Sequence, residues 1–321
     1  MDAVKLTVVI PMLNEEANIA PLFDRLFPVL HGMGETFEVV VIDDGSKDKT
    51  LSLLNAVKAE HPELCILSFA RNFGQHAAVM AGFEAARGEW VVTLDADLQN
   101  PPEEIPAICE QLRKGHDLVN TYRMGRQDSS FRLTASKITN NVARRFSGIT
   151  LRDFGCMLRG YHRDVVKPMT LRKEFRTFIP ALAMLYARSP VEIPVGHEAR
   201  SRGVSNYSFR KLLSLQLDLI TSFSIAPLRL LFVLGWSVAG LGLGFGFLLL
   251  ILRALHGPEW AAQGVFTLFA ILFIFIGAQF LAFGLLGEYI GRIYQEVRSR
   301  PTYLLRKTDV ENNSGKGEGE K

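Results

Sequence analysis

One stretch of sequence decides how the chain folds: Glu89-Trp90-Val91-Val92-Thr93-Leu94-Asp95-Ala96-Asp97-Leu98-Gln99. Its hydrophobic run ends in two carboxylates spaced two residues apart. In an extended segment, residues i and i+2 project to the same side, so Asp95 and Asp97 should share a face while Ala96 turns away. The stretch therefore predicts a buried strand that delivers a pair of acids at its end.

A helix start follows directly. Asn100 is expected to cap a helix that opens with Pro101-Pro102-Glu103-Glu104, because proline suits the first turn and acidic residues suit its positive end. This order places the acids at the C-terminal edge of a sheet, where open α/β sheets bind ligands. Carboxylate oxygens suit Mg²⁺ or Mn²⁺ carried with a diphosphate. An isolated Asp-x-Asp is equally consistent with a solvated loop, so the rest of the chain must decide.

Further strands and helices alternate along the first half of the chain. Apolar runs predict strands at 6–10, 37–42, 65–69, 90–94 and 117–121. Apolar residues at helical spacing follow several of these runs. Such alternation predicts an α/β fold with a mostly parallel sheet and helices on both faces. Neither Gly-x-Gly-x-x-Gly nor a P-loop motif occurs, which argues against dinucleotide and P-loop sites.

Composition narrows the classes of partner. The 321 residues exceed a typical domain, and 48% hydrophobic content with a mean hydropathy of +0.14 indicates a region that is not water-soluble. A net charge of +3 is too small to argue for nucleic acid. The three scattered cysteines predict free thiols in a reducing compartment. The segment 123–145 holds six basic residues against one acid, which fits a solvated surface or a site for a phosphorylated lipid.

Two long uncharged runs predict a membrane anchor. Residues 230–252 and 265–286 contain no charge, and each run exceeds the ~20 residues that a helix needs to cross the hydrocarbon. Segment 207–229 mixes apolar and basic residues and predicts an interfacial helix. Basic residues concentrate outside the linker 253–264, so the catalytic domain (residues 1–206), the C-terminal segment 287–321 and both termini should be cytoplasmic. We therefore expect a multi-pass protein of the cytoplasmic (inner) membrane whose tail, 311–321, is disordered.

Several motifs together resemble one enzyme family. They are Val9-Ile10-Pro11-Met12-Leu13-Asn14-Glu15-Glu16, Ile42-Asp43-Asp44-Gly45-Ser46-Lys47-Asp48, Asp95-Ala96-Asp97-Leu98-Gln99-Asn100-Pro101-Pro102-Glu103 and Asp153-Phe154-Gly155-Cys156-Met157-Leu158-Arg159. The chain resembles, over nearly its whole length, the family 2 inverting glycosyltransferases that load a sugar onto a polyprenyl phosphate, such as dolichol-phosphate mannose synthase and bactoprenol glucosyltransferase. The resemblance implies a nucleotide-diphospho-sugar transferase (A-type glycosyltransferase) fold.

The resemblance also implies roles for particular residues. Those expected to bind the nucleotide sugar are Pro11, Asn14, Glu15, Asp43, Asp44, Asp95 and Arg200. Those expected to hold Mg²⁺ or Mn²⁺ are Asp97, Asp95 and Gln99. Those expected to bind the acceptor phosphate, and with Asp97 to act in catalysis, are Arg123, Arg132 and Ser136. Simpler interpretations remain open: Asp43 also suits a turn before Gly45, Asn14 and Glu15 suit a helix start, and the arginines suit a solvated surface.

The implied reaction transfers a sugar with inversion from a UDP donor, expected to be UDP-4-deoxy-4-formamido-L-arabinose, to undecaprenyl phosphate for lipid A modification of lipopolysaccharide. Transfer of glucose, mannose or another hexose is the alternative, and a catalytically silent nucleotide-sugar sensor is the alternative from another class. Processive synthases carry Gln-x-x-Arg-Trp, which this chain lacks. Membrane lipids and further copies of the chain are the other expected partners. One position departs from the family: Asn206 replaces an expected lysine, whose task would fall to Arg200 or Arg202.

Overall fold

The computed structural model describes residues 3–123, 151–153, 155–171, 179–196, 226–256, 265–297 and 303–306. The chain divides into two compact units. The first comprises Met1–Ser208 together with Arg300–Lys321, and the second is Phe209–Ser299. The second unit is therefore an insertion, because the chain leaves the first unit and later returns to it.

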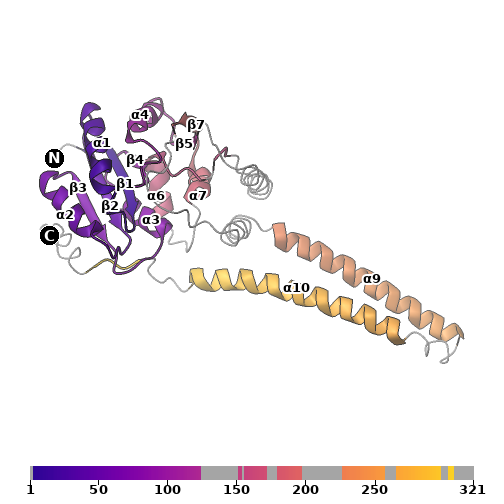
Figure 1. Ribbon diagram of the computed structural model, residues 1–321. Helices are drawn as coiled ribbons and strands as arrows, with labels where there is room; N and C mark the ends of the chain where they lie inside the picture. The colour runs from indigo at the N-terminus through magenta and orange to yellow at the C-terminus, as the bar shows by residue number, and fades with distance from the viewer. Residues whose placement is uncertain are drawn as a thin grey trace, which may run out of the picture. The chain divides into compact units, whose positions relative to one another are not determined.

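A seven-stranded sheet forms the centre of the first unit, in the order β3-β2-β1-β4-β6-β5-β7 (Figure 1). The strands are β1 (Leu6–Met12), β2 (Phe37–Asp43), β3 (Leu64–Ser68), β4 (Trp90–Thr93), β5 (Leu118–Arg123), β6 (Arg159–His162) and β7 (Pro190–Val195). β6 is antiparallel to both of its neighbours, and the other pairings are parallel. The expected mostly parallel sheet is confirmed, with β6 as the exception.

Helices cover both faces of this sheet (Figure 1). They are α1 (Ile19–Gly32), α2 (Thr50–Glu60), α3 (Gln75–Ala85), the 3₁₀ turn η1 (Pro102–Glu104), α4 (Ile105–Arg113), α6 (Arg163–Leu171) and α7 (Ile179–Tyr186). Alternate residues of β1 enter different cores: Val8 packs with α1, α2 and α4, whereas Val9 packs with α3, α6 and α7. Burial on both faces explains why the strands appear in the sequence as continuous apolar runs.

Two local expectations need correction. The first strand was expected to end at Pro11, but β1 continues through it to Met12, paired with β2. Asn100 was expected to cap a helix, but it makes no cap and its Oδ1 accepts a hydrogen bond from Cys156 Sγ at 3.5 Å. The reason is the pair of prolines: each disfavours helical geometry in the residue before it, so Pro101 is extended and the turn begins only at Pro102.

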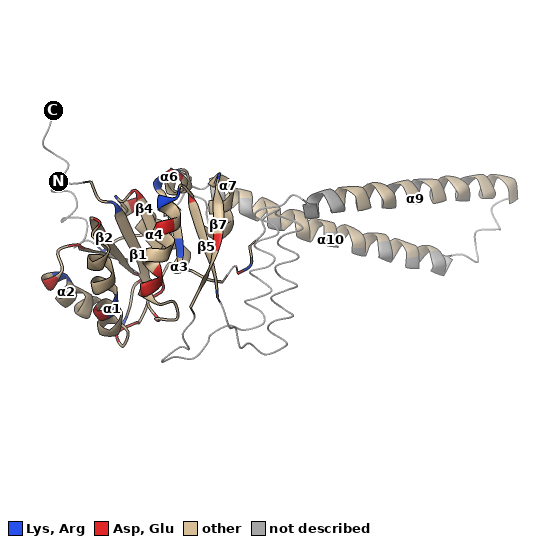
Figure 2. Ribbon diagram, turned by 90° about the horizontal axis from the view of Figure 1, so that it is seen from above, with Lys and Arg blue, Asp and Glu red and all other residues tan. Residues whose placement is uncertain are grey.

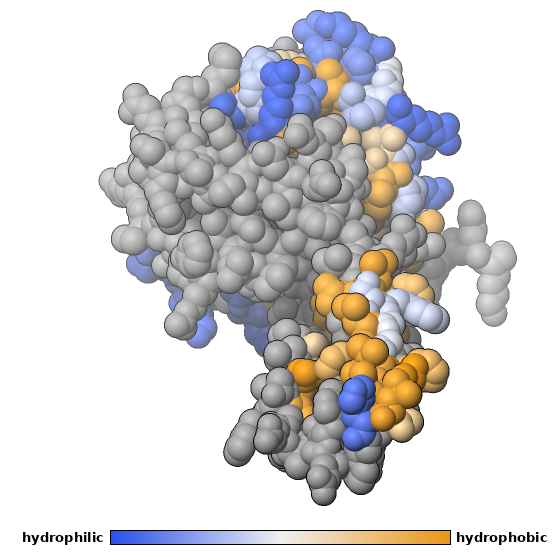
Figure 3. Space-filling model, turned by 90° about the vertical axis from the view of Figure 1, so that its right-hand side faces the viewer, coloured by the Kyte–Doolittle hydropathy of each residue, from blue (hydrophilic) through white to orange (hydrophobic). Residues whose placement is uncertain are grey.

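The second unit contains two long helices, α9 (Ala226–His256) and α10 (Val265–Val297). Their coloured parts are tan in Figure 2, as expected for the uncharged runs 230–252 and 265–286, and Figure 3 shows hydrophobic side chains on their surface. Large apolar side chains that are exposed on them include Phe232, Trp236, Leu241, Phe247, Phe280 and Ile290. Among the described residues, no helix is both long enough and apolar enough to cross a membrane. The expected interfacial helix at 207–229 lies almost wholly outside the described residues.

The packing of α3 on the sheet supplies a stability prediction. A Cβ added at Gly82 would overlap the side chains of Val9 and Ile42, whereas one added at Gly32 of α1 would meet nothing within 4 Å. We expect Gly82→Ala to lower the free energy of unfolding by about 1–3 kcal/mol, the usual cost of overpacking. Gly32→Ala should raise it by up to about 1 kcal/mol, because alanine favours helices. Thermal unfolding of the two full-length variants measures the contrast, and equal midpoints would contradict this packing.

Candidate functional site

The carboxylate pair lies just beyond the carboxyl end of β4. Leu94 continues beside β1 through its backbone N–H, which donates to Val9 O at 3.0 Å, and Ala96 is buried in the core. Asp95 and Asp97 are partly buried and flank that anchored alanine. The alternation inferred from the sequence is therefore present, although β4 ends at Thr93 and the acids belong to a turn.

Each acid of the pair is held by a nearby amide. Gln75, the first residue of α3, donates from Nε2 to Asp95 Oδ1 at 2.8 Å. The backbone N–H of Gln99 donates to Asp97 Oδ1 at 3.1 Å, which closes a short turn. Gln99 was expected as a metal ligand, and its side chain lies partly buried at the same turn. Gln75 was not expected at the site at all.

Negative charge accumulates around Asp95. The pKa of its carboxyl is raised to about 7, first by burial and then by the charges of Asp97 and Glu15, while Arg123 and Gln75 act in the opposite direction. Like charges held together out of water disfavour ionisation. Within the described ranges, no group of three or more His, Cys, Asp or Glu side chains forms a metal cage. Two carboxylates do not fill the coordination shell of Mg²⁺, so a cation bound by Asp95 and Asp97 would also take oxygen ligands from water or from a bound molecule.

The loops after β1 and β2 brace each other. Asn14 has a positive φ of 55°, its N–H donates to Ser46 Oγ at 2.9 Å, and its Oδ1 accepts from Lys47 N at 2.9 Å. Glu15 N donates to Thr50 Oγ1 at 2.9 Å. Cross-bracing of this kind holds the Glu15 side chain near the carboxylate pair. Pro11 lies within β1 below this loop.

Asp43 is fully buried at the end of β2, with both carboxylate oxygens engaged. Oδ1 accepts from Ser46 N at 3.0 Å and Oδ2 accepts from Ser68 Oγ at 3.0 Å. The first contact is the turn that the simpler interpretation of Asp43 described. Gly45 completes it with a φ of +73°, and a Cβ there would lie 2.5 Å from the carbonyl carbon of Arg71. The turn is thus packed directly against the loop after β3.

Asp44 anchors that same loop. Its oxygens accept from the N–H groups of Phe73 and Gly74 at 2.7 and 2.9 Å, immediately before α3 begins. Burial raises the pKa of Asp44 in spite of these two hydrogen bonds. Because Gln75 follows at once and holds Asp95, Asp44 connects the β2 edge with the carboxylate pair.

Arg123 ends β5, and its positive charge opposes the rise in the pKa of Asp95 that burial causes. Its guanidinium donates two parallel hydrogen bonds to the Asp153 carboxylate, from Nε to Oδ2 at 2.7 Å and from Nη2 to Oδ1 at 3.1 Å. Gly155 N also donates to Asp153 Oδ1 at 2.9 Å, and a Cβ at Gly155 would lie 3.0 Å from Arg123 Nη2. The buried Arg159 supports this loop by donating to the backbone oxygens of Asp153 and Cys156.

The site therefore brings together most of the expected residues that the structure describes. Arg132, Ser136 and Arg200 lie outside the described residues. Gln75 and Asp153 are the additions. Asp153 begins one of the motifs quoted above, but no periodicity or spacing in the sequence indicates that Gln75 reaches Asp95 or that Asp153 reaches Arg123.

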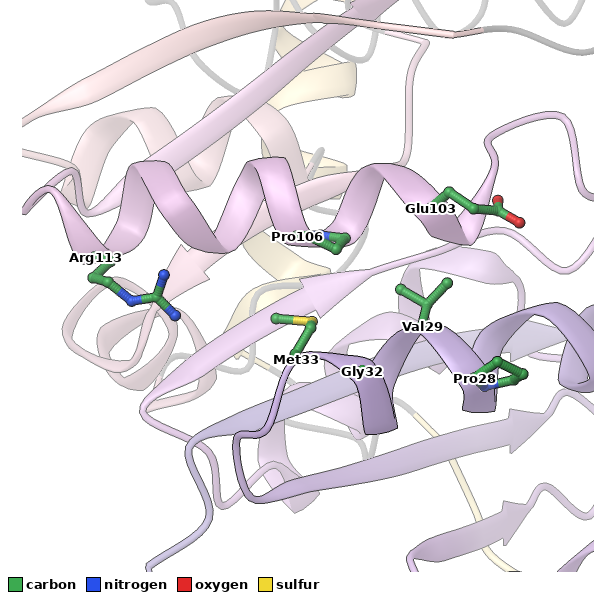
Figure 4. Close-up of a pocket in the computed structure, with 7 residues that line it drawn as sticks. All are labelled: Pro28, Val29, Gly32, Met33, Glu103, Pro106 and Arg113. Carbon is green, nitrogen blue, oxygen red and sulfur yellow. The ribbon is translucent and has the colours of Figure 1, made fainter.

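A separate groove of about 430 Å³ lies between α1 and α4 (Figure 4). The residues that line it are Pro28, Val29, Gly32, Met33, Glu103, Pro106 and Arg113. Its charged side chains are already paired, Glu103 with Arg25 and Arg113 with Glu35, each at 2.9 Å. None of the expected site residues lines it, so the groove is distinct from the carboxylate site.

Comparisons with known proteins agree with the resemblance inferred from the motifs. Residues 7–169 match the model of glycosyl transferase family 2. The undecaprenyl-phosphate 4-deoxy-4-formamido-L-arabinose transferase of Shewanella sediminis is 50% identical over 93% of this chain and 91% of its own length. The protein of the same name from Photorhabdus laumondii is 49% identical over 98% of both chains.

Among solved structures, one similar chain is the glucosyl-3-phosphoglycerate synthase of Mycobacterium tuberculosis in complex with Mn²⁺, uridine diphosphate and phosphoglyceric acid. It is 20% identical, the alignment covers 68% of this chain and 76% of that one, and the TM-score is 0.48. The family match and the identity to full-length relatives decide the classification. The chain belongs to glycosyl transferase family 2.

Proposed function

We propose that this glycosyltransferase moves a sugar from a uridine-diphosphate donor, expected to be UDP-4-deoxy-4-formamido-L-arabinose, to undecaprenyl phosphate. The observation that carries the proposal is the collection of negative charge formed by Asp95, Asp97 and Glu15, which the positive charge of Arg123 partly offsets. The names of relatives that are about half identical over nearly the whole chain support the choice of sugar and lipid.

A divalent cation fits the carboxylate pair. Mg²⁺ typically binds through one or two carboxylates and completes its shell with substrate phosphates and water. This agrees with two acids in one turn and with the lack of a larger cage among the described residues. Asp97 and Asp95 would hold Mg²⁺ or Mn²⁺, with Gln99 beside them, and the ion would neutralise the departing diphosphate.

The acceptor requires little activation. A phosphate monoester has a second pKa near ~6, so its oxygen is ionised at neutral pH and no strong general base is needed. That oxygen attacks the anomeric carbon, a new C–O bond forms as the bond to the diphosphate breaks, and the configuration inverts. The protein must bring two anions together without repulsion, and forked arginine donors suit this task. Among the residues that the structure describes, Arg123 is proposed to bind the acceptor phosphate. Arg132 and Ser136 are proposed to add further contacts to it.

The donor's nucleoside is proposed to lie over the ends of β1 and β2, beside Pro11, Asn14, Asp43 and Asp44. Asp43 is fully buried and already accepts two hydrogen bonds, yet an ionised carboxylate has about four lone-pair sites. Its proposed role is therefore to fix the Ser46 turn and offer any remaining acceptor to the nucleoside. Arg200 is proposed to assist the diphosphate in place of the absent lysine.

Membrane attachment completes the proposal. The acceptor is a lipid, and α9 and α10 expose many large apolar side chains in stretches that carry no charge. The first unit contains residues that precede this insertion and residues that follow it. We infer that residues 209–299 anchor the enzyme in the cytoplasmic membrane with the catalytic unit in the cytoplasm.

Mass spectrometry of the lipid product tests the proposed reaction. Membranes that contain the full chain, supplied with undecaprenyl phosphate and a panel of UDP-sugars, should form undecaprenyl phosphate linked to 4-deoxy-4-formamido-L-arabinose. Asp97→Asn should lower the rate by at least about a hundredfold, the scale on which lost transition-state charge stabilisation acts. The control is Asp164→Asn, whose side chain is 88% exposed on α6. Product from a UDP-hexose alone would favour the hexosyl alternative, and no product from any donor would favour the sensor.

The fork between Arg123 and Asp153 generates a second prediction. Asp153→Asn removes the charge that orients the guanidinium, and charge-assisted hydrogen bonds contribute roughly 1.5–3 kcal/mol. We expect kcat/KM for the lipid acceptor to fall by about ten- to a hundredfold, since ~1.4 kcal/mol corresponds to tenfold. The KM for the donor should change little. Arg152→Gln in the same loop, where the side chain is 69% exposed, serves as the control. A raised donor KM with unchanged acceptor kinetics would assign Arg123 to the nucleotide instead.

A further inference from the structure

The chain returns to the first unit after α10 and adds a short segment to the sheet edge. We call residues Tyr303–Arg306 the C-terminal clasp. Leu305 forms an antiparallel bridge with Phe69, Ala70 N donates to Leu304 O at 2.8 Å, and Arg306 N donates to Ser68 O at 2.9 Å. β3 is the outermost strand on this side of the sheet, so the clasp satisfies backbone groups that no other strand reaches.

Tyr303 fastens the clasp through its side chain. Its ring stacks on Phe69 with centroids 4.8 Å apart and an interplanar angle of 14°. Its hydroxyl donates to Glu84 Oε2 of α3 at 2.6 Å. The phenol is protonated at neutral pH, and burial raises its pKa further from neutrality. Tyr303 therefore joins the end of β3 to α3.

The C-terminal clasp contacts the first residues of the loop 69–75. This loop ends at Gln75, which donates a hydrogen bond to Asp95. Phe69, under the Tyr303 ring, meets Phe73 edge to face at 5.7 Å. The next residue, Gly74, is held by Asp44, and Gln75 then reaches Asp95. Residues 69–75 are thus fixed at the start by the clasp, in the middle by Asp44 and at the end by Asp95.

If the C-terminal clasp served only to cover the exposed edge of β3, its hydrogen bonds should be distributed along the whole strand. β3 extends over Leu64–Ser68, yet the bridge forms at Phe69, one residue beyond its end. The hydrogen bonds of the clasp go to Ser68 and Ala70 on either side of that residue. Ser68 also donates from its hydroxyl to Asp43. The contacts concentrate at the ligand-binding edge and leave the rest of the strand uncovered by the clasp.

We propose that the C-terminal clasp positions the loop 69–75, and through Gln75 the carboxylate Asp95, for binding of the donor diphosphate, with Tyr303 as the positioning residue. The proposal rests on the proposed function of the carboxylate pair. Its consequence is that donor affinity depends on residues that follow α9 and α10 in the chain. The nucleotide site is therefore complete only when the chain has returned from the inserted unit.

Two measurements on the full-length protein in detergent test the proposal. Amide hydrogen exchange of residues 68–75 reports whether the clasp holds the loop, and calorimetric titration with UDP in the presence of Mn²⁺ reports donor affinity. Tyr303→Ala should speed the exchange and weaken UDP binding about tenfold, a loss of ~1.4 kcal/mol. Tyr303→Phe keeps the ring stack and should recover most of both. Leu304→Ala is the matched control, because that side chain is 53% exposed and only its backbone joins the clasp.

The results of these measurements distinguish a failure of the clasp proposal from a failure of the proposed reaction. Unchanged exchange in Tyr303→Ala, with an unchanged unfolding midpoint, would overturn the clasp. Faster exchange with unaltered UDP binding would overturn its coupling to the donor site. If the wild type binds UDP and Tyr303→Ala weakens that binding while no lipid product forms from any donor, the clasp is supported and only the proposed function fails.

Discussion

The burial of one carboxylate beside two others is the constraint on which the site depends. Asp95 ionises with difficulty because it is partly buried beside Asp97 and Glu15, and its pKa rises from 3.8 to about 7. The unfolded chain loses this proton at lower pH than the folded chain does. In the absence of a cation, the Asp95 contribution to stability therefore falls as pH rises from 3.8 to about 7. The divalent cation that we propose would offset that loss, which would link folding to the chemistry of the site.

The scaffold keeps the acids together by bracing the loops rather than by a single strong contact. The sheet, buried on both faces, fixes where β1, β2 and β4 end. Asn14 ties the first loop to the second, and Asp44 ties the second to the start of α3. Gln75 then completes the connection to Asp95. Each hydrogen bond contributes only about 0.5–1.5 kcal/mol, so precision comes from their number and from their rigid supports.

Much of this arrangement follows from local sequence pattern. The apolar runs predicted the first five strands to within a few residues, because burial on both faces leaves a continuous hydrophobic signal. The alternation at Asp95-Ala96-Asp97 predicted that Ala96 turns away from the face of the two acids, and the structure shows that Ala96 is buried in the core. Motif resemblance predicted the family. The prediction that Asn100 caps a helix is wrong, because two consecutive prolines delay the start of the helical turn to Pro102. The prediction that the first strand ends at Pro11 is also wrong, because the pairing of β1 with β2 continues to Met12.

The rest depends on contacts between distant segments of the chain. Gln75 and Asp95 are 20 residues apart, Arg123 and Asp153 are 30 apart, and Glu84 and Tyr303 are 219 apart. No periodicity connects such pairs, since the fold alone brings them together. For Asp43 the sequence left a ligand-binding role and a turn open, and the structure adds that its oxygens already bind Ser46 and Ser68.

The most direct test of the account is whether the carboxylate pair holds the cation. Calorimetric titration of the full-length protein with Mn²⁺, in the presence of saturating UDP, measures this apart from turnover. The wild type should show one Mn²⁺ site, and the Kd should be at least about tenfold higher in Asp97→Asn, because one of the two carboxylate ligands is lost. Equal affinity in the two proteins would contradict the account, since the charge collected at Asp95 and Asp97 would then have no cation to neutralise it.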